Sequence, residues 1–549
     1  MTALSGGGPA RDAMPELPAR AAGPGGAYFS TMRGLTMRWL RKCRGIGSAA
    51  VVVTLASVAL AGCAGDEPEA AAAQSGERTL TLGVSGEPQS FDPALQQSGG
   101  DQRWRWQATF DSLLHCEEDG SVVPNAAESY TLSKDARTLT MKLREGMTFS
   151  DGSPVDAAAA KATIEHMKVG GGSDAGRVAD VTVETPDDLT VVLEAPRPTG
   201  QLPTFMCLAP GAIAQPEQIE SGAVASNPVS SGPYVLDVAG STSGSVYRFE
   251  KRDDYWNADA YAYDVITFVT MSEATARLNA LMSGEIDGAT INYDQAGEAE
   301  SAGLHVLSAP GTWTGLYLND RAGERVPALG DVRVRRAINM VFDRQAVADH
   351  IMGGEATPTT QIFNPSSAAF DPELDERYPY DIEAARKLMK EAGYSGGFEV
   401  EVPTQGENPI YAPMVAQQLG LLNIRVKEVP LTGPTAITDI LGGRFSIMDA
   451  RMSTSASSLF SIVEALEPGS IWNVMQTEDP KLQHLLDEAQ VARGERADEV
   501  YREINEYVVD QAWFAPWVAE NTFFAVRDAE MLPAMSDPFK FNPYLRDFK

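Results

Sequence analysis

The sequence lacks the motifs on which most secreted hydrolases and nucleotide-binding enzymes depend. It contains no G-x-S-x-G elbow, no S-x-x-K pair and no H-E-x-x-H helix, and the dipeptide Gly-Lys never occurs, which excludes a P-loop. Only five histidines occur in 549 residues, and none has a second histidine at metal-ligand spacing. These absences predict a protein that is not an enzyme and has no metal site or cofactor. A hydrolase with a triad assembled from distant residues stays open as an alternative.

Basic residues are also scarce. The chain has 44 Lys and Arg against 75 Asp and Glu, a formal net charge of -31. A nucleic-acid-binding protein needs a basic face, so this balance excludes nucleic acid as a partner and indicates a soluble, acidic surface. The hydrophobic fraction of 43% is ordinary for globular proteins, and 549 residues exceed what one core supports. Two or more domains are expected.

One apolar run stands out near the amino terminus. Basic residues precede Ile46 to Leu60, which suits a signal peptide and is short for a membrane span. The run ends in Leu60-Ala61-Gly62-Cys63, which resembles the lipobox of bacterial lipoproteins. That resemblance implies a signal peptide over residues 37–62, a lipidated (palmitate-bearing) Cys63 and an anchor on the extracytoplasmic face of the cell membrane. A small-residue cleavage site with an accidental cysteine is the alternative.

The residues on either side of this signal have no pattern of a folded element. Residues 1–36 are expected to be an upstream extension of the gene, and residues 63–78 a lipidated cysteine with a flexible tether. Of the four cysteines, Cys116 and Cys207 remain in the mature, oxidising compartment. A disulfide between them and two free thiols are both open, because spacing alone does not bring cysteines within bridging distance.

The stretch from Leu143 to Met167 joins an alternating strand to an alanine-rich helix. Ser150-Asp151-Gly152-Ser153 supplies turn residues, and Asp156 is placed to cap a helix from Ala157. No lysine or arginine lies in the turn to hold an anion. This stretch therefore predicts a structural corner and not a catalytic loop.

Helical and strand patterns alternate along the rest of the chain. Asp331, Asp343 and Asp381 precede helical spacings, and strands are expected over residues 79–84, 189–194 and 265–270. This mixture predicts a multi-lobed α/β fold.

The corner sequence L-R-E-G-M-T-F-S-D-G-S-P-V-D-A resembles the hallmark of the family 5 solute-binding proteins of ABC importers, the oligopeptide, dipeptide and nickel-binding group. Further segments match that family in order, from residue 79 to about residue 526. They are residues 110–128, 230–236, 251–257, 278–288, 331–344 and 380–394.

The resemblance implies a two-lobed clamp of the periplasmic-binding-protein type (type II, cluster C-like) with a discontinuous first lobe. Lobe I is expected over residues 79–311 and 517–549, and lobe II over residues 312–516, with crossings near 312–319 and 515–523. The implied partners are a solute, ABC permease subunits with their ATPase and the membrane, with the chain itself a monomer. A ligand sensor of the same fold without a permease is an alternative.

The resemblance also bears on the ligand. Peptide-binding members pair the peptide's free amine with an aspartate, and the corresponding segment here carries Ser457-Ser458, with Asp449 earlier in it. A neutral or N-blocked solute is therefore expected, or an anionic one if Arg103 or Arg451 faces the cleft. A chelated metal or another non-peptide solute stays open. Aromatic residues expected at the cleft are Trp104, Trp313 and Trp472.

Overall fold

The structure is a computed structural model that describes residues 76–87, 90–96, 100–172, 174–405, 411–431, 436–539 and 541–549. The predicted signal peptide, Cys63 and the tether up to residue 75 lie outside these residues. Among the described helices, none combines the length and the apolar character needed to cross a bilayer.

A mixed nine-stranded sheet is the central element of the folded chain. Its order is β16-β12-β17-β11-β1-β10-β9-β8, with β13 beside β17. β1 runs parallel to β10 and β11, and the other pairs are antiparallel. The strands are β1 (Thr79–Val84), β8 (Tyr234–Thr242), β9 (Val246–Lys251), β10 (Val265–Thr270), β11 (Gly288–Ile291), β12 (His305–Leu318), β13 (Ala356–Pro358), β16 (Ile447–Ser453) and β17 (Phe514–Val526).

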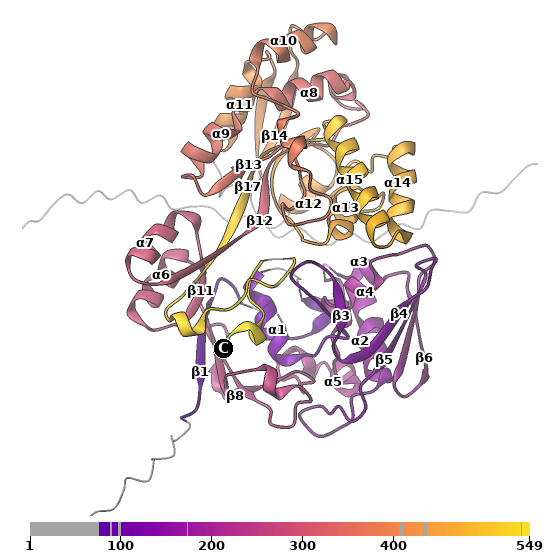
Figure 1. Cartoon of the computed structure of the whole chain (residues 1–549), viewed down its shortest axis with the longest axis vertical. Helices are drawn as coiled ribbons and strands as arrows, with labels where there is room; N and C mark the ends of the chain where they lie inside the picture. Colours follow the sequence, from indigo (N-terminus) through magenta and orange to yellow (C-terminus); the bar gives the residue numbers. More distant parts are fainter. Residues whose placement is uncertain are drawn as a thin grey trace, which may run out of the picture. The chain divides into compact units, whose positions relative to one another are not determined.

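Two long strands of this sheet join the lobes (Figure 1). β12 and β17 pair from His305↔Val526 to Tyr317↔Phe514. At one end β17 pairs with β11 of lobe I, and towards the other end it pairs with β13 of lobe II. The predicted crossings near 312–319 and 515–523 fall within these strands, while the exact lobe boundaries stay predictions.

The register of this hinge pair shifts between Thr314 and Gly315. A Cβ atom at Gly315 would lie 2.5 Å from the carbonyl oxygen of Ala515 and 2.5 Å from the Cα of Pro516. The irregularity therefore requires glycine, because any side chain would collide with the backbone of the partner strand.

Lobe I contains the start of the described chain, β1 to β11 and the C-terminal end. The predicted corner is confirmed: β5 buries Leu139, Met141 and Leu143, and Asp156 accepts a hydrogen bond from the Ala159 N–H at 2.9 Å at the start of α2. The remaining elements are the sheet β4-β5-β7-β6 (Ala127–Leu132, Thr138–Leu143, Thr190–Glu194, Thr182–Asp187), the pair β2 (Leu114–Cys116) and β3 (Val122–Pro124), and the helices α1 (Arg103–Thr109), α2 (Ala157–Gly170), α3 (Ala175–Val178), α4 (Leu202–Phe205), α5 (Pro216–Ser221), α6 (Ala274–Ser283) and α7 (Ala296–Ser301).

Lobe II packs helices around β16, β12 and the parallel pair β14 (Glu399–Gln405) and β15 (Arg425–Leu431). Asp331, Asp343 and Asp381 accept hydrogen bonds from backbone N–H groups at the starts of α8, α9 and α10, which confirms the three predicted helix starts. The helices are α8 (Val332–Met340), α9 (Arg344–Ala346), α10 (Ile382–Glu391), α11 (Tyr411–Gly420), α12 (Ala436–Leu441), α13 (Ser458–Leu466), α14 (Pro480–Val491) and α15 (Glu495–Asp510).

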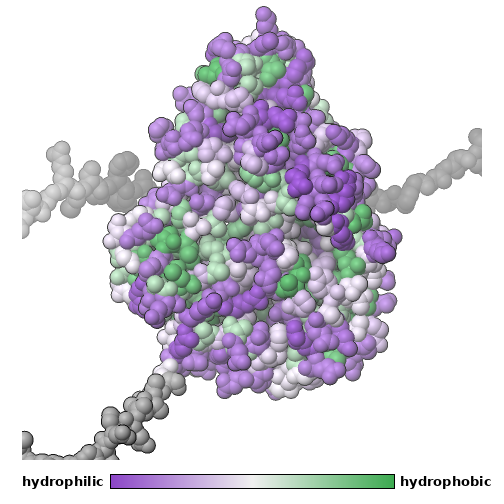
Figure 2. All heavy atoms as spheres, in the orientation of Figure 1, coloured by the Kyte–Doolittle hydropathy of each residue, from purple (hydrophilic) through white to green (hydrophobic). Residues whose placement is uncertain are grey.

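Each lobe has cores of its own. Lobe I packs one core around Leu139 and Ile164 and a second around Phe249 and Phe268. Lobe II packs residues such as Ile338, Ile462 and Leu486. Hydrophilic residues dominate the face in Figure 2, with smaller separate hydrophobic patches. Separate cores joined by two strands are what a clamp requires, because each lobe moves as a body.

Candidate functional site

A cavity of about 1420 Å³, part of it open to solvent, lies at the hinge strands. Its position is beyond the carboxyl ends of β1 and β11, where ligands bind in open α/β sheets. Both lobes and the crossing strands contribute to it. The lining residues include Ser85, Asp101, Arg277 and Asn292 of lobe I, Thr312, Glu520 and Thr522 of the hinge, and Met352, Tyr411 and Arg451 of lobe II.

One ion pair lies in the wall of this hinge cavity. Glu520 is 3% exposed, and one of its oxygens accepts a hydrogen bond from Arg451 Nε at 2.7 Å while the other accepts one from the Thr314 hydroxyl. The Arg451 side chain remains 54% exposed. Its pair with Glu520 uses the Nε–H, so the Nη groups keep N–H donors that suit a carboxylate.

Two other charged residues of the wall form hydrogen bonds with groups of the protein itself. Arg277 donates to the carbonyl oxygens of Thr290, Met271 and Ser272 at 2.7–2.9 Å. Asp101 accepts hydrogen bonds from the backbone N–H and the hydroxyl of Ser85. Arg451 is the most exposed of the charged side chains of the wall, so its Nη donors are the most accessible to a solute.

Neutral polar groups complete the wall. The hydroxyls of Tyr293 and Tyr411 donate to Ile351 O at 3.2 Å and to Met352 Sδ at 3.6 Å. Asn542 is 6% exposed, and its side-chain oxygen has no hydrogen-bond partner among the described residues. This oxygen is buried away from solvent, so a solute in the cavity does not reach it without a local rearrangement.

Of the predicted site residues, only Arg451 lines the hinge cavity. Asp449 lies on the same strand, two residues earlier and opposite Leu316, and does not line it. Burial raises the pKa of Asp449 to about 6. Trp313 and Trp472 line a separate, smaller hollow of about 320 Å³.

Arg103 and Trp104, which were also predicted to lie at the cleft, do not line the hinge cavity. Arg103 is 3% exposed and forms an ion pair with Asp537 at 2.5 Å. Trp104 is 1% exposed, and its indole N–H donates to the Pro543 carbonyl at 2.6 Å. Both side chains fix the C-terminal segment to α1 and are part of the interior of lobe I.

Ser457 lies where the lobes touch. A Cβ atom at Gly120 of lobe I would lie 2.8 Å from the backbone nitrogen of Ser457, so this contact requires glycine. Beside it, the Ala456 N–H donates to Pro538 O at 2.9 Å and the rings of Phe460 and Phe539 lie 4.9 Å apart. The lobes are therefore in contact around α13, in a closed arrangement.

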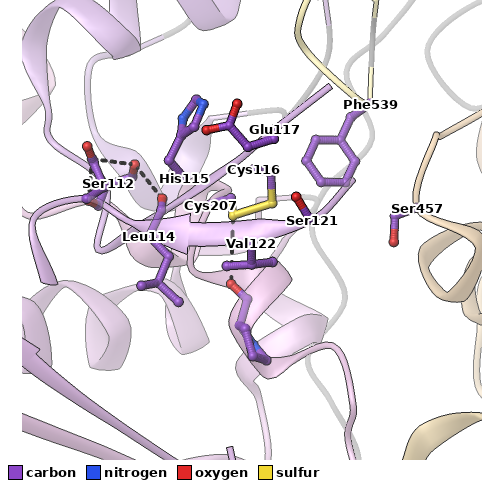
Figure 3. Close-up of a disulfide and its surroundings, with 12 residues drawn as sticks. Ser112, Leu114, His115, Cys116, Glu117, Ser121, Val122, Cys207, Ser457 and Phe539 are labelled. Atoms are coloured by element: carbon purple, nitrogen blue, oxygen red, sulfur yellow. Dashed lines mark hydrogen bonds between the residues drawn. A yellow bond between two sulfur atoms is a disulfide. The ribbon is translucent and has the colours of Figure 1, made fainter. Parts of the chain in front are cut away.

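Cys116 and Cys207 form a disulfide bond with a Cα–Cα distance of 5.7 Å (Figure 3). The bond joins the end of β2 to the segment after α4 inside lobe I. Figure 3 shows Phe539 and Ser457 on the same side of this bond. The disulfide thus supports the part of lobe I that α13 contacts.

Several residues of the wall could not be predicted from the sequence. Glu520 stands in a β-rich run that was recognised as a crossing, and an acid there could have been singled out because acids are rarely buried unpaired. Nothing in the sequence marks Asn542 or Tyr411. They reach the cavity from segments far away in the chain.

The fold and cavity define a two-lobed clamp that encloses a site at its hinge. Residues 121–470 match the model of the bacterial extracellular solute-binding proteins, family 5 middle. The chain belongs to this family.

Similar proteins agree with this assignment. The glutathione-binding protein GsiB of Salmonella paratyphi A is 29% identical over 304 residues, which cover 53% of this chain and 56% of GsiB. The chain thus matches about half the length of this relative. Among solved structures, AgaA of A. tumefaciens R10 in complex with agropinic acid has a TM-score of 0.71 at 23% identity, covering 86% of this chain and 98% of AgaA. DppA of Helicobacter pylori in complex with the peptide STSA has a TM-score of 0.69 at 20% identity, covering 86% and 98%.

Proposed function

We propose that this protein is the solute-binding component of an ABC importer and that it carries a small carboxylate-bearing solute in the hinge cavity. The observation that supports this most is the composition of the wall, to which both lobes and both crossing strands contribute. A solute there touches both lobes at once, so it favours the closed state through contacts that the open state lacks. The closed protein then delivers the solute to permease subunits driven by an ATPase.

The class of solute follows from Arg451. Its unused N–H donors suit a carboxylate. Relatives carry names or ligands that fit this class: glutathione, agropinic acid and a peptide each contain a carboxyl group. Native mass spectrometry of solute that co-purifies with the full chain tests the proposal.

Two alternatives make different predictions. A sensor of the same fold binds the same solute but has no permease, so genes for two permease subunits and an ATPase beside this gene favour transport and an isolated gene favours sensing. A secreted hydrolase is the alternative from another class. Turnover of a peptide or ester that one Ser→Ala change abolishes would favour it over binding alone.

We further propose that Cys63 carries the lipid that holds the protein on the extracytoplasmic face of the membrane. Two or three acyl chains, at about 0.8 kcal/mol per buried CH₂, suffice for stable anchoring. Cys63→Ser should leave the folded chain intact and move it from the membrane fraction to the soluble fraction, with its signal uncleaved or miscleaved. Cys43→Ser, in the signal itself, is the matched control. A Cys63→Ser protein that still takes up labelled lipid would refute the anchor.

A further inference from the structure

A second crevice lies between the lobes, away from the hinge. It has a volume of about 1330 Å³, part of it open to solvent, and no lining residue in common with the hinge cavity. Lobe I contributes the segment 195–201 and residues of α3, and lobe II contributes the end of α13 and the loop that follows it. Figure 1 places α3 and α4 on the lobe I side and α13 and α14 on the lobe II side.

Direct contacts between the lobes border this rim crevice. Arg177 forms an ion pair with Glu464 at 2.7 Å, and the Gly200 N–H donates to the side-chain oxygen of Gln490 at 2.7 Å. The Gln201 side chain donates to Leu459 O at 2.8 Å. The rim crevice therefore belongs to the closed arrangement, and it loses one wall when the lobes separate.

One acceptor at the crevice lacks a strong donor. Glu467 accepts a hydrogen bond from Gln490 Nε2 at 3.2 Å, and no ion pair to it is found in the part of the chain that is described. Burial raises the pKa of Glu467, although the charge of Arg197 lowers it. The Glu467 carboxylate can therefore accept a further hydrogen bond from a ligand.

The charges around the crevice favour a cation. Asp180, Glu464 and Glu467 line it together with two arginines, and Asp487 adds a negative charge near Glu467. Arg177 is paired with Asp174 and Glu464, and the charge of Arg197 acts on Glu467, so the lining is negative on balance but not free of positive charge. Glu467 also follows the last turn of α13, and the carboxyl end of a helix attracts positive charge.

The walls of the crevice are apolar. Ile471 is 61% exposed, and Trp472, Val463, Pro196 and Pro198 line the same space. An isolated exposed isoleucine is ordinary, but here it stands beside a tryptophan and two prolines at the rim of a hollow. Such a wall suits a ring-sized apolar body, and an indole face also attracts an adjacent cation.

We propose that the rim crevice is a binding site for a small organic cation, a primary ammonium on an apolar, ring-sized body, with Glu467 as its acceptor. Because both lobes form the site, a cation bound there stabilises the closed state. Its binding is then coupled to binding in the hinge cavity, and the coupling is reciprocal.

Phenethylammonium is a suitable probe, and phenylacetate is the matched anion with a similar body. Calorimetry on the full chain in detergent should show saturable binding of phenethylammonium and none of phenylacetate. Glu467→Gln should weaken the cation at least about tenfold, because it removes the charge and keeps the shape. Ile471→Ala, at an exposed position, should weaken it severalfold. Glu298→Gln removes one charge from the exposed surface of α7, away from both cavities, and should leave the affinity unchanged.

Equal binding of the two probes, no saturable binding, or unchanged affinity in Glu467→Gln would overturn the rim site. An equal loss of binding in Glu298→Gln would overturn it as well, because the effect would then follow from the net charge of the protein and not from the rim crevice. The proposed import function is tested separately. If the protein carries a solute in the hinge cavity but does not bind phenethylammonium, only the rim site is refuted.

Discussion

Tripeptides with a free amino terminus should bind at least about a hundredfold more weakly than the solute that the protein carries. The two carboxylates of the hinge cavity are already engaged, because Asp101 accepts two hydrogen bonds from Ser85 and Glu520 accepts hydrogen bonds from Arg451 and Thr314. Ser457 and Ser458 lie outside this cavity and bring no carboxylate to it. An ammonium closed into a site without a partner costs several kcal/mol, and each 1.4 kcal/mol is a factor of ten in affinity.

Calorimetry with a free-amine tripeptide and its N-acetylated form, at equal length and sequence, checks this expectation. The acetylated form should bind more tightly, and Arg451→Lys should weaken it, because a lysine keeps a charge near Glu520 but loses the planar pair of donors. Asp449 is the acid that would make the free-amine tripeptide bind more tightly if it paired with the ammonium group. Its pKa of about 6 means that it becomes fully charged only as the pH rises through that value. Tight free-amine binding that strengthens from pH 5 to pH 7 and disappears in Asp449→Ala would contradict the expectation.

Removing the disulfide should lower the free energy of unfolding by about 4–5 kcal/mol, since a cross-link across 91 residues strongly restricts the unfolded chain. Cys116→Ala with Cys207→Ala is the change, and denaturant unfolding is the measurement. Wild-type protein treated with a reductant is the matched control, because it keeps both sulfur atoms in the core. A loss under about 1 kcal/mol in both samples would show that the bond does not stabilise lobe I.

Local structure could be predicted from the sequence where local chemistry decides it. Asp156, Asp331 and Asp381 accept backbone hydrogen bonds within a few residues of themselves, so their helix starts were readable. The alternation of β5 was readable for the same reason. The two crossings came from the family resemblance and not from any local pattern.

The site could not be predicted in the same way. Arg103 pairs with a residue 434 positions later, and Trp104 donates to a carbonyl 439 positions later. Nothing near them in the sequence distinguishes a buried partner from a cleft wall. The sequence shows that Arg451 is charged. It does not show that Arg451 lies at the cavity, because that position depends on the pairing of β16 with β12 across more than a hundred residues.

Native mass spectrometry of the full chain, purified from the cells that naturally produce it, tests the central claim most directly. The account predicts one small carboxylate-bearing molecule per chain, released unchanged on denaturation, with occupancy reduced in Arg451→Lys and retained in Glu467→Gln. A chain that carries no solute, a bound molecule that the protein converts to a product, or equal occupancy in Arg451→Lys would contradict it.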